Sequence, residues 1–332
     1  MSGDRLFDDV KEQVRKIVPS AVNITNIDFE GPLVVIYTKD LEAFSNNGDL
    51  VRQLAQGLRK RVAIRPDPSS LANPDEVEKK LRQIIPVEAE IVDIYFEEDD
   101  GEVFIEAMNP GLVIGKGGAV LNEIKKEVGW SPKVVRAPPI PSKTVSEIRQ
   151  LLRHMQDDRK EFLRKVARRL VRPKYEGENW IRMTTLGGYR EVGRSSTLLS
   201  TRDSKILIDC GTMPGESSHP GPFFEAPEVQ PLENIDAVVI THAHMDHCNL
   251  LPALFKYGYD GPVYCTPPTR DLMSLLLVDS LKVTAGENKK VPFESTHIRE
   301  MVKHIITLKY NETTDIAPDM RLTFQNLSLI HI

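Results

Sequence analysis

The sequence has few cysteines and no long apolar run. Its 332 residues include only Cys210, Cys248 and Cys265, and these do not form a CxxC pair. This spacing argues against a disulfide framework or a cysteine zinc knuckle and favours reduced thiols, so we expect a cytoplasmic protein. No stretch of 18 or more apolar residues occurs, and the polar start is not a secretory signal. We therefore expect no membrane partner.

The first 140 residues contain one small unit written twice. In residues 1–70, a helical pattern over residues 4–18 is followed by two strand-like runs, a second helix and a third strand. Residues 71–140 repeat this order, and at an offset of 70 residues Val35 matches Ile105 and Gly48 matches Gly118. A repeated αββααβ unit is a more specific signal than any single helix or strand. We therefore predict two α+β domains with the same fold.

A basic helical segment follows these two units. Prolines at positions 138, 139 and 141 mark the boundary, and residues 142–174 hold 11 Lys/Arg against four Asp/Glu, a local net charge of +7. The whole chain, in contrast, has a net charge of −5. One interpretation of residues 141–175 is a solvated linker helix. The other is a surface that follows the phosphates of a nucleic acid, because cations gain affinity there by releasing counterions.

Residues 176–326 alternate strands and helices, which indicates an α/β layered domain. Its main feature is the segment THAHMDH, residues 241–247, directly after an apolar strand. Imidazole nitrogens and carboxylate oxygens are the ligands of hydrolytic zinc, which makes His242, His244, Asp246 and His247 candidate metal ligands. A tight loop could turn all four toward two metal ions. The plainer interpretation is a polar loop whose histidines only cap neighbouring elements.

A glycine-rich loop in the second repeat is the other chemical signature. Residues 113–118 read VIGKGG, so that Gly115, Lys116, Gly117 and Gly118 form a Gly-x-x-Gly loop between two helices. Such a loop lets the backbone approach a sugar–phosphate chain, and the adjacent Val113 and Ile114 would offer an apolar groove for bases. In the first repeat the corresponding residues 45–48 read SNNG and lack the first glycine. We expect the first repeat to serve in packing or partner binding.

These motifs resemble known families. The HxHxDH segment, together with Asp209 at the end of an apolar strand, resembles the metallo-β-lactamase superfamily, and the second repeat resembles a KH domain. Residues 183–195, MTTLGGYREVGRS, complete a resemblance to the archaeal cleavage and polyadenylation specificity factors, also described as archaeal transcription termination factors. The resemblance covers residues 1 to about 326. It implies two KH-like units followed by an incomplete metallo-β-lactamase αββα core.

The resemblance also implies a function. It predicts a zinc-dependent β-CASP ribonuclease that cuts RNA internally, trims it in the 5′–3′ direction and acts in 3′-end formation and transcription termination. Its expected partners are single-stranded RNA, RNA polymerase with elongation factors, and a second copy of the full-length protein. Of two Zn²⁺ ions, His242 and His244 would bind the first, and Asp246 and His247 the second. Asp246 would also handle the proton of the attacking hydroxide, while Asp209 would orient the loop.

The same resemblance predicts that the enzyme is incomplete. In the family, a strand like the one at residues 321–326 leads into Ala-Gly-His, whose histidine completes the first zinc site. Here Leu329 occupies the ligand position, and His331 is out of register. We hypothesise that residues 327–332 are a non-native tail translated from a transposase adapter. The bridging aspartate would then be missing, and the chain would not cut RNA.

Two other functions are compatible with these motifs. One is a small-molecule hydrolase of the metallo-β-lactamase type, but such an enzyme does not require two KH-like units and a basic helix. The other is a non-catalytic RNA-binding scaffold with an inactive metal loop. The intact set of four candidate ligands argues against the scaffold. Substitution of His244 would separate a nuclease from it.

Overall fold

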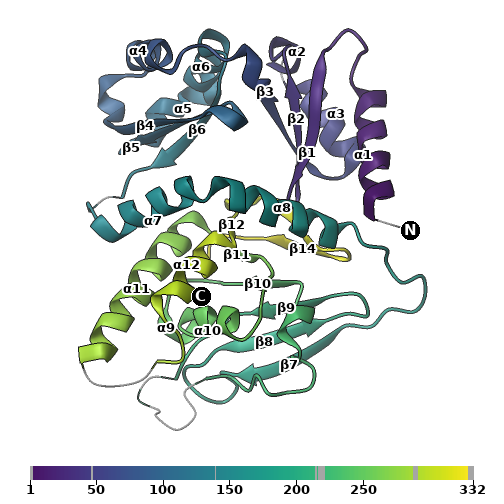
Figure 1. Cartoon of the computed structure of the whole chain (residues 1–332), viewed down its shortest axis with the longest axis vertical. Coiled ribbons are helices and arrows are strands. Elements are labelled where there is room, and N and C mark those ends of the chain that lie inside the picture. Colours follow the sequence, from purple (N-terminus) through teal and green to yellow (C-terminus); the bar gives the residue numbers. More distant parts are fainter. Residues whose placement is uncertain are drawn as a thin grey trace. The chain divides into compact units, whose positions relative to one another are not determined.

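The computed structural model describes residues 3–45, 48–138, 140–213, 215, 221–286 and 291–327. The chain divides into two compact units, Met1–Ser142 (unit 1) and Lys143–Ile332 (unit 2) (Figure 1). No helix in the described ranges is long and apolar enough to cross a membrane.

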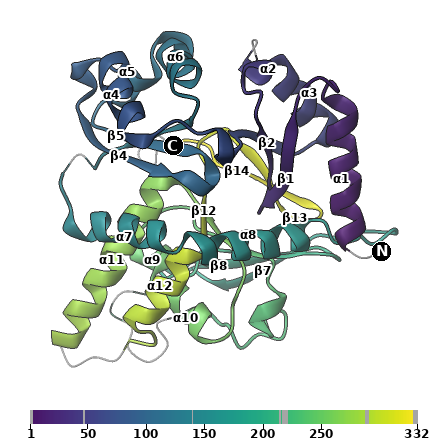
Figure 2. The ribbon, with the colours of Figure 1, turned by 45° about the horizontal axis from the view of Figure 1, so that its top comes forward.

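Unit 1 contains the predicted repeat. The first KH-like domain consists of α1 (Gly3–Ile17), β1 (Ile24–Glu30), β2 (Leu33–Thr38), α2 (Glu42–Ser45), α3 (Asp49–Leu58) and β3 (Arg61–Pro66). The second consists of α4 (Pro74–Ile84), β4 (Ile91–Glu97), β5 (Glu102–Ala107), α5 (Pro110–Ile114), α6 (Ala119–Val128) and β6 (Ser131–Arg136). Both sheets place the second strand in the middle, with an antiparallel neighbour before it and a parallel neighbour after it. Figure 2 shows the helices of each domain, α1 to α3 and α4 to α6, beside the strands β1–β2 and β4–β5 of the same domain. The αββααβ prediction is confirmed in both halves.

Helix capping, the spacing of apolar residues and one buried indole explain how the second KH-like domain folds. Helix α4 begins at Pro74, where the side chain of Asn73 accepts a hydrogen bond from the Asp75 amide, a normal N-cap. One face of the helix buries Val77 and Leu81, four residues apart, in a core with the apolar residues of β5 and α6. The indole of Trp130 is buried in the same core and satisfies its N–H by donating to the Ala72 carbonyl at 3.0 Å.

Buried charges join the two domains within unit 1. Arg65 of β3 donates to Glu102 of β5 at 2.7 Å and also pairs with Glu30 of β1. Tyr37 of β2 donates to Asp100 at 3.1 Å. A buried ion pair contributes little if both partners are replaced together, but removing one partner leaves a costly unpaired charge. These contacts therefore fix how the first domain packs against the second.

Unit 2 is built on a six-stranded sheet. Its elements are α7 (Lys143–His154), α8 (Gln156–Leu170), β7 (Arg182–Gly187), β8 (Ser196–Ser200), β9 (Lys205–Ile208), β10 (Ala237–Val239), α9 (Met245–Cys248), α10 (Leu251–Lys256), β11 (Val263–Cys265), α11 (Pro267–Gly286), α12 (Ser295–Lys303), β12 (Ile305–Thr307), β13 (Thr313–Ala317) and β14 (Met320–Thr323). The strand order is β12-β11-β10-β9-β8-β7. Strands β7 to β9 pair antiparallel, and β9 to β12 pair parallel.

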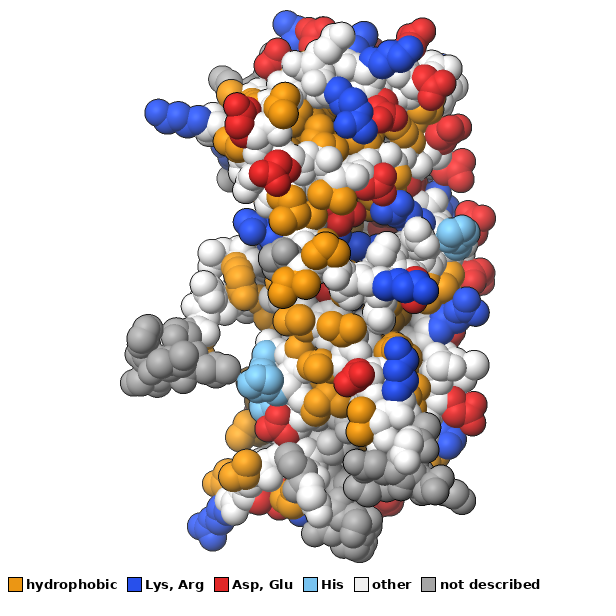
Figure 3. Space-filling model, turned by 90° about the vertical axis from the view of Figure 1, so that its left-hand side faces the viewer, with side chains coloured by type: hydrophobic (Ala, Val, Ile, Leu, Met, Phe, Trp, Pro, Cys, Tyr) orange, Lys and Arg blue, Asp and Glu red, His pale blue; other side chains and the backbone are white. Residues whose placement is uncertain are grey.

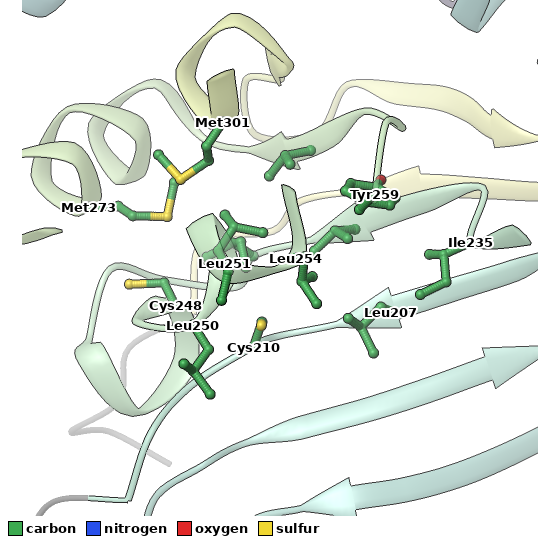
Figure 4. Close-up of a cluster of buried hydrophobic side chains, with 14 of the residues drawn as sticks. Leu207, Cys210, Ile235, Cys248, Leu250, Leu251, Leu254, Tyr259, Met273 and Met301 are labelled. Carbon is green, nitrogen blue, oxygen red and sulfur yellow. The ribbon is translucent and has the colours of Figure 1, made fainter. Parts of the chain in front are cut away.

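The two faces of this sheet are covered differently. One face packs against helices α9 to α12. The core between this face and the helices includes Leu207, Cys210, Leu251, Met273 and Met301 (Figure 4). The other face packs against the β13–β14 hairpin through a cluster that includes Tyr264 and Ile316. Strands β9 and β10 run parallel, so their carboxyl ends, followed by Asp209 and by residues 241–247, lie at the same edge.

The basic segment differs from both interpretations of residues 141–175. It forms α7 and α8, which belong to unit 2 and bury Phe162, Val166 and Leu170, so it is not a solvated linker. At least five of its 11 cations are used within unit 2, which argues against a cationic face reserved for phosphates. Their partners are Asp271 for Arg149, the Lys303 and Ile305 carbonyls for Arg159, Asp260 for Lys165 and Arg169, and Asp236 for Arg172.

Candidate metal centre and RNA-binding loop

The structure brings the four predicted metal ligands together. The imidazole ring of His242 lies 4.6 Å from that of His244 and 4.1 Å from that of His247, measured between ring centroids. His242 Nε2 and His244 Nδ1 are 3.1 Å apart, and His247 Nε2 is 3.6 Å from an Asp246 carboxylate oxygen. The side chains therefore gather at one place instead of spreading in different directions.

The second half of the motif is helical, which the sequence did not predict. Residues Met245–Cys248 form the short helix α9, and His244 occupies its N-cap position. The cause is packing: Cys248 is fully buried, and Met245 contacts the same core. The helical turn places Asp246 and His247 next to each other on the exposed side of that core.

Asp209 holds this arrangement from the neighbouring strand. It is 4% exposed, and its carboxylate accepts hydrogen bonds from the Thr241 amide at 2.8 Å and from the Thr241 hydroxyl. Its Oδ2 atom, which accepts from that hydroxyl at 2.9 Å, also lies 2.7 Å from His247 Nδ1. A carboxylate that accepts a hydrogen bond from the Nδ1–H group of a histidine fixes the tautomer in which Nε2 is free for a ligand. This geometry fits the predicted orienting role of Asp209.

The backbone after Asp209 packs directly on α9. The Cys210 amide donates to the His247 carbonyl at 2.6 Å, and the Ser195 amide donates to the Asp246 carbonyl at 2.8 Å. A Cβ atom at Gly211 would lie 1.7 Å from that same Asp246 carbonyl oxygen. Only glycine allows this approach. The sequence patterns did not indicate these contacts of Gly211 and Ser195, although a glycine two residues after the strand-end aspartate was a usable signal.

The surroundings change the proton affinity of two imidazoles in opposite directions. Burial, with the nearby rings of His247 and His244, lowers the pKa of His242 and favours its neutral form. The hydrogen bond to Asp209 raises the pKa of His247. Neutral imidazole is the form that binds metals. Across the described ranges, however, no three His, Cys, Asp or Glu side chains are arranged to hold a metal ion.

The GxxG loop lies between α5 and α6. Gly115, Gly117 and Gly118 have positive φ angles of 74°, 63° and 81°, a region that favours glycine. Lys116 is exposed, and Ile114 is 39% exposed. Val113 is fully buried, so the prediction that it lines a groove for bases is wrong. Because α5 is a helix, the outward neighbours of the loop are instead Ile114 and Leu112, which is 42% exposed.

The corresponding loop of the first KH-like domain is only partly within the described residues. Asn46 and Asn47 lie outside them, and Gly48 has a positive φ of 68° just before α3. The expected role of this domain in packing or partner binding therefore stays a prediction.

Comparisons with known proteins match this architecture. A family model described as "Transcription termination factor FttA, KH domain" matches residues 4–71, a KH domain model matches residues 72–151, and a metallo-β-lactamase superfamily model matches residues 198–329. Transcription termination factor FttA of Methanosarcina mazei is 52% identical over 318 residues, which is 96% of this chain and 50% of the relative. This chain is similar to transcription termination factor FttA over nearly its whole length. It has two KH domains followed by a metallo-β-lactamase domain, as predicted.

Two further relatives named FttA are also similar to this chain. That of Methanocaldococcus jannaschii is 47% identical over 98% of this chain and 51% of the relative, and that of a Lokiarchaeum is 38% identical over 97% and 52%. The chain thus spans about half the length of the curated relatives it matches. Among solved structures, the short form of human tRNase Z is 21% identical over 35% of this chain and 43% of that chain, with a TM-score of only 0.21.

The predicted truncation with a foreign tail is not supported by these matches. The relatives align with nearly the whole chain, and the superfamily model extends to residue 329, past the boundary predicted at residue 327. Leu329 and His331, on which that prediction rested, lie outside the described residues.

Proposed function

We propose that this chain carries the RNA-binding and metal-binding parts of a metal-dependent ribonuclease that acts in transcription termination and RNA 3′-end formation. The observation that carries the proposal is the cluster of three imidazoles and two carboxylates at the ends of β9 and β10. The FttA relatives add termination as the process. Cutting within RNA, 5′–3′ trimming, contact with RNA polymerase and elongation factors, pairing of two copies and a cytoplasmic location belong to the same proposal.

Imidazole nitrogen and carboxylate oxygen are donors of the chemical type that zinc takes in proteins. His242 and His244 would hold one ion, and Asp246 and His247 a second, because their nitrogen and oxygen atoms already lie within a few ångströms of each other. Bound zinc would lower the pKa of the water molecule that it binds and would stabilise negative charge on a phosphoryl oxygen. Each zinc ion commonly takes three or four protein ligands, so further donors are needed. We therefore propose that the chain by itself does not cut RNA.

The residues of the chain would divide the remaining work. Asp209 holds His247 by accepting a hydrogen bond from its Nδ1–H group, which keeps Nε2 directed toward Asp246. Asp246, itself partly exposed, would accept the proton of the attacking water. The GxxG loop of residues 115–118, with Ile114 beside it, would hold single-stranded RNA through backbone amides and the charge of Lys116.

The test compares metal binding and RNA cleavage in two histidine variants. His244→Ala should lose zinc from the purified chain, and the equivalent substitution in a full-length relative should reduce cleavage of a U-rich transcript by at least about 100-fold. His154→Ala is the matched control, because His154 is an exposed histidine at the end of α7. If the His244 variant of the chain bound zinc as well as the His154 variant, and the substituted full-length relative cut RNA as well as its wild type, the nuclease proposal would be wrong.

A second candidate is a non-catalytic RNA-binding scaffold. The observation that favours it is the pairing of donors with each other: His242 lies against His244, and His247 pairs with Asp209. In that case the cluster would only stabilise the loop. The scaffold predicts normal RNA binding in a full-length relative with no cleavage and no zinc-dependent change in stability.

A further inference from the structure

The loop between β7 and β8, residues 188–194, exposes side chains that the fold does not use. Tyr189 is 71% exposed and Val192 is 86% exposed, and Arg190 is also exposed. One face of the molecule shows other hydrophobic side chains at its surface, between charged ones (Figure 3). Exposed single apolar residues are common and need no explanation, but an exposed tyrosine beside an arginine is a frequent feature of binding surfaces.

The backbone of this loop is held in a strained conformation. Arg190 and Arg194 have positive φ angles of 61° and 40°, and Gly188 and Gly193 have 76° and 100°. Left-handed backbone at non-glycine residues costs free energy, and such residues concentrate at functional sites. Arg190 is exposed, so no buried contact of its side chain requires this conformation.

A fork of hydrogen bonds braces the loop. The carboxylate of Glu191 accepts from the Gly188 amide at 3.0 Å and from two nitrogens of Arg194 at 2.7 and 2.8 Å. The loop therefore stays folded without help from the side chains at its tip. Of its three charged residues, Glu191 and Arg194 neutralise each other, so Arg190 gives the loop a net charge of +1.

The base of the loop is attached to the candidate metal centre. Ser195, the next residue, donates its amide to the Asp246 carbonyl at 2.8 Å, and its carbonyl accepts from the Gly211 amide at 3.2 Å. A Cβ at Gly187 would lie 2.3 Å from the Arg194 carbonyl oxygen, so the two arms of the loop approach as closely as the backbone permits. Any movement of this loop base would shift the backbone of Asp246.

We propose that Tyr189 and Arg190 form a contact platform for one nucleotide of single-stranded RNA beside the candidate metal centre. Tyr189 would stack on a base, and Arg190 would contact the adjacent phosphate. Aromatic stacking and a cation are the usual means of holding unpaired RNA without sequence preference. The proposal rests on the proposed function for its ligand, and it assigns to this loop the positioning of RNA at the cutting site, separate from capture by the GxxG loop.

The test maps where RNA touches the full chain. A single-stranded RNA with 4-thiouridine at successive positions is cross-linked to the chain, and the modified peptides are identified by mass spectrometry. Tyr189→Leu is compared with Tyr189→Phe, which keeps the ring, and with Val192→Ala, because Val192 is another exposed apolar residue of the same loop. We expect a cross-link within residues 183–194 in the wild type, in Tyr189→Phe and in Val192→Ala.

In Tyr189→Leu this cross-link should disappear, cross-links to residues 111–118 should persist, and RNA affinity should fall about tenfold, as expected for loss of one stacked base. Arg190→Gln should reduce the salt dependence of binding by about one phosphate contact. Absence of the cross-link from the wild type, or equal behaviour of the leucine and phenylalanine variants, would overturn the platform. Because cross-linking does not require cleavage, the platform can be correct even if the nuclease proposal fails. The nuclease proposal can likewise be correct even if the platform fails.

Discussion

The GxxG loop, residues 115–118, and the candidate metal loop, residues 241–247, form their candidate sites in opposite ways. The GxxG loop uses backbone: three glycines with positive φ angles occur within four residues, and the exposed Lys116 adds charge. The metal loop uses side chains, and residues far away in the sequence hold them. Asp209 lies 32 residues before Thr241, and Gly211 lets the next segment touch the Asp246 carbonyl. A backbone site can therefore be formed by consecutive residues, whereas a side-chain site depends on close packing from another strand.

The largest effect should come from that close packing. Gly211→Ala would place a Cβ atom 1.7 Å from the Asp246 carbonyl oxygen, so the backbone of the metal loop or of residues 209–212 must move. We expect the free energy of unfolding of unit 2 to fall by about 3 kcal/mol, near the upper end for overpacking. The matched control is Gly286→Ala, where the added Cβ meets no atom within 4 Å.

The cysteines provide a readout specific to unit 2. All three are buried in it, and burial raises the pKa of Cys248 to about 12 and that of Cys265 to about 12. Thiols that are buried and protonated react slowly, so labelling at pH 8 reports opening of unit 2. In urea, labelling of Gly211→Ala should begin at lower concentration than labelling of Gly286→Ala. Identical midpoints for the two variants would show that the contact at Gly211 does not limit the site.

A medium effect should come from the remote carboxylate. Asp209→Asn keeps the shape of the side chain but replaces the acceptor that faces His247 Nδ1 with a group that is no longer charged. Loss of such a supporting partner typically weakens metal binding by about 10- to 100-fold. Zinc affinity measured by competition with a chromophoric chelator should show this loss in Asp209→Asn. The exposed Asp279 on α11, changed to asparagine, should leave affinity unchanged, and equal loss in both variants would contradict the orienting role.

The sequence predicted the fold and the gathering of the candidate ligands because both depend on local patterns. The αββααβ repeat follows from hydrophobic periodicity, and a polar HxHxDH segment after a buried strand must lie at the end of that strand. The prediction that Val113 lines a groove was wrong because α5 has only five residues, too few for their periodicity to show which side faces the core. A one-residue change in helix phase exchanges Val113 for Leu112 and Ile114.

The packing of the basic segment could not be predicted for a different reason. Its cations pair with Asp236, Asp260 and Asp271, which lie 64 to 122 residues away in the sequence, and charge patterns do not indicate distant partners. The same limitation concealed Gly211, whose importance comes from a contact with Asp246. In both cases the missing information was which segments the fold brings side by side.

The smallest expected effect tests the backbone site. Gly117 and Gly129 both have positive φ angles, 63° and 68°, and a Cβ at either would meet no atom within 4 Å. Alanine at each position should therefore cost similar stability, about 1 kcal/mol. Only Gly117 belongs to the GxxG loop, whereas Gly129 ends α6.

If the loop backbone approaches RNA directly, Gly117→Ala should lower the affinity for single-stranded RNA by about tenfold, a loss of about 1.4 kcal/mol. Gly129→Ala should bind RNA like the wild type in the same titration. Equal affinity of the two variants would mean that RNA is held by side chains such as Lys116, and that the two candidate sites are formed in the same way after all.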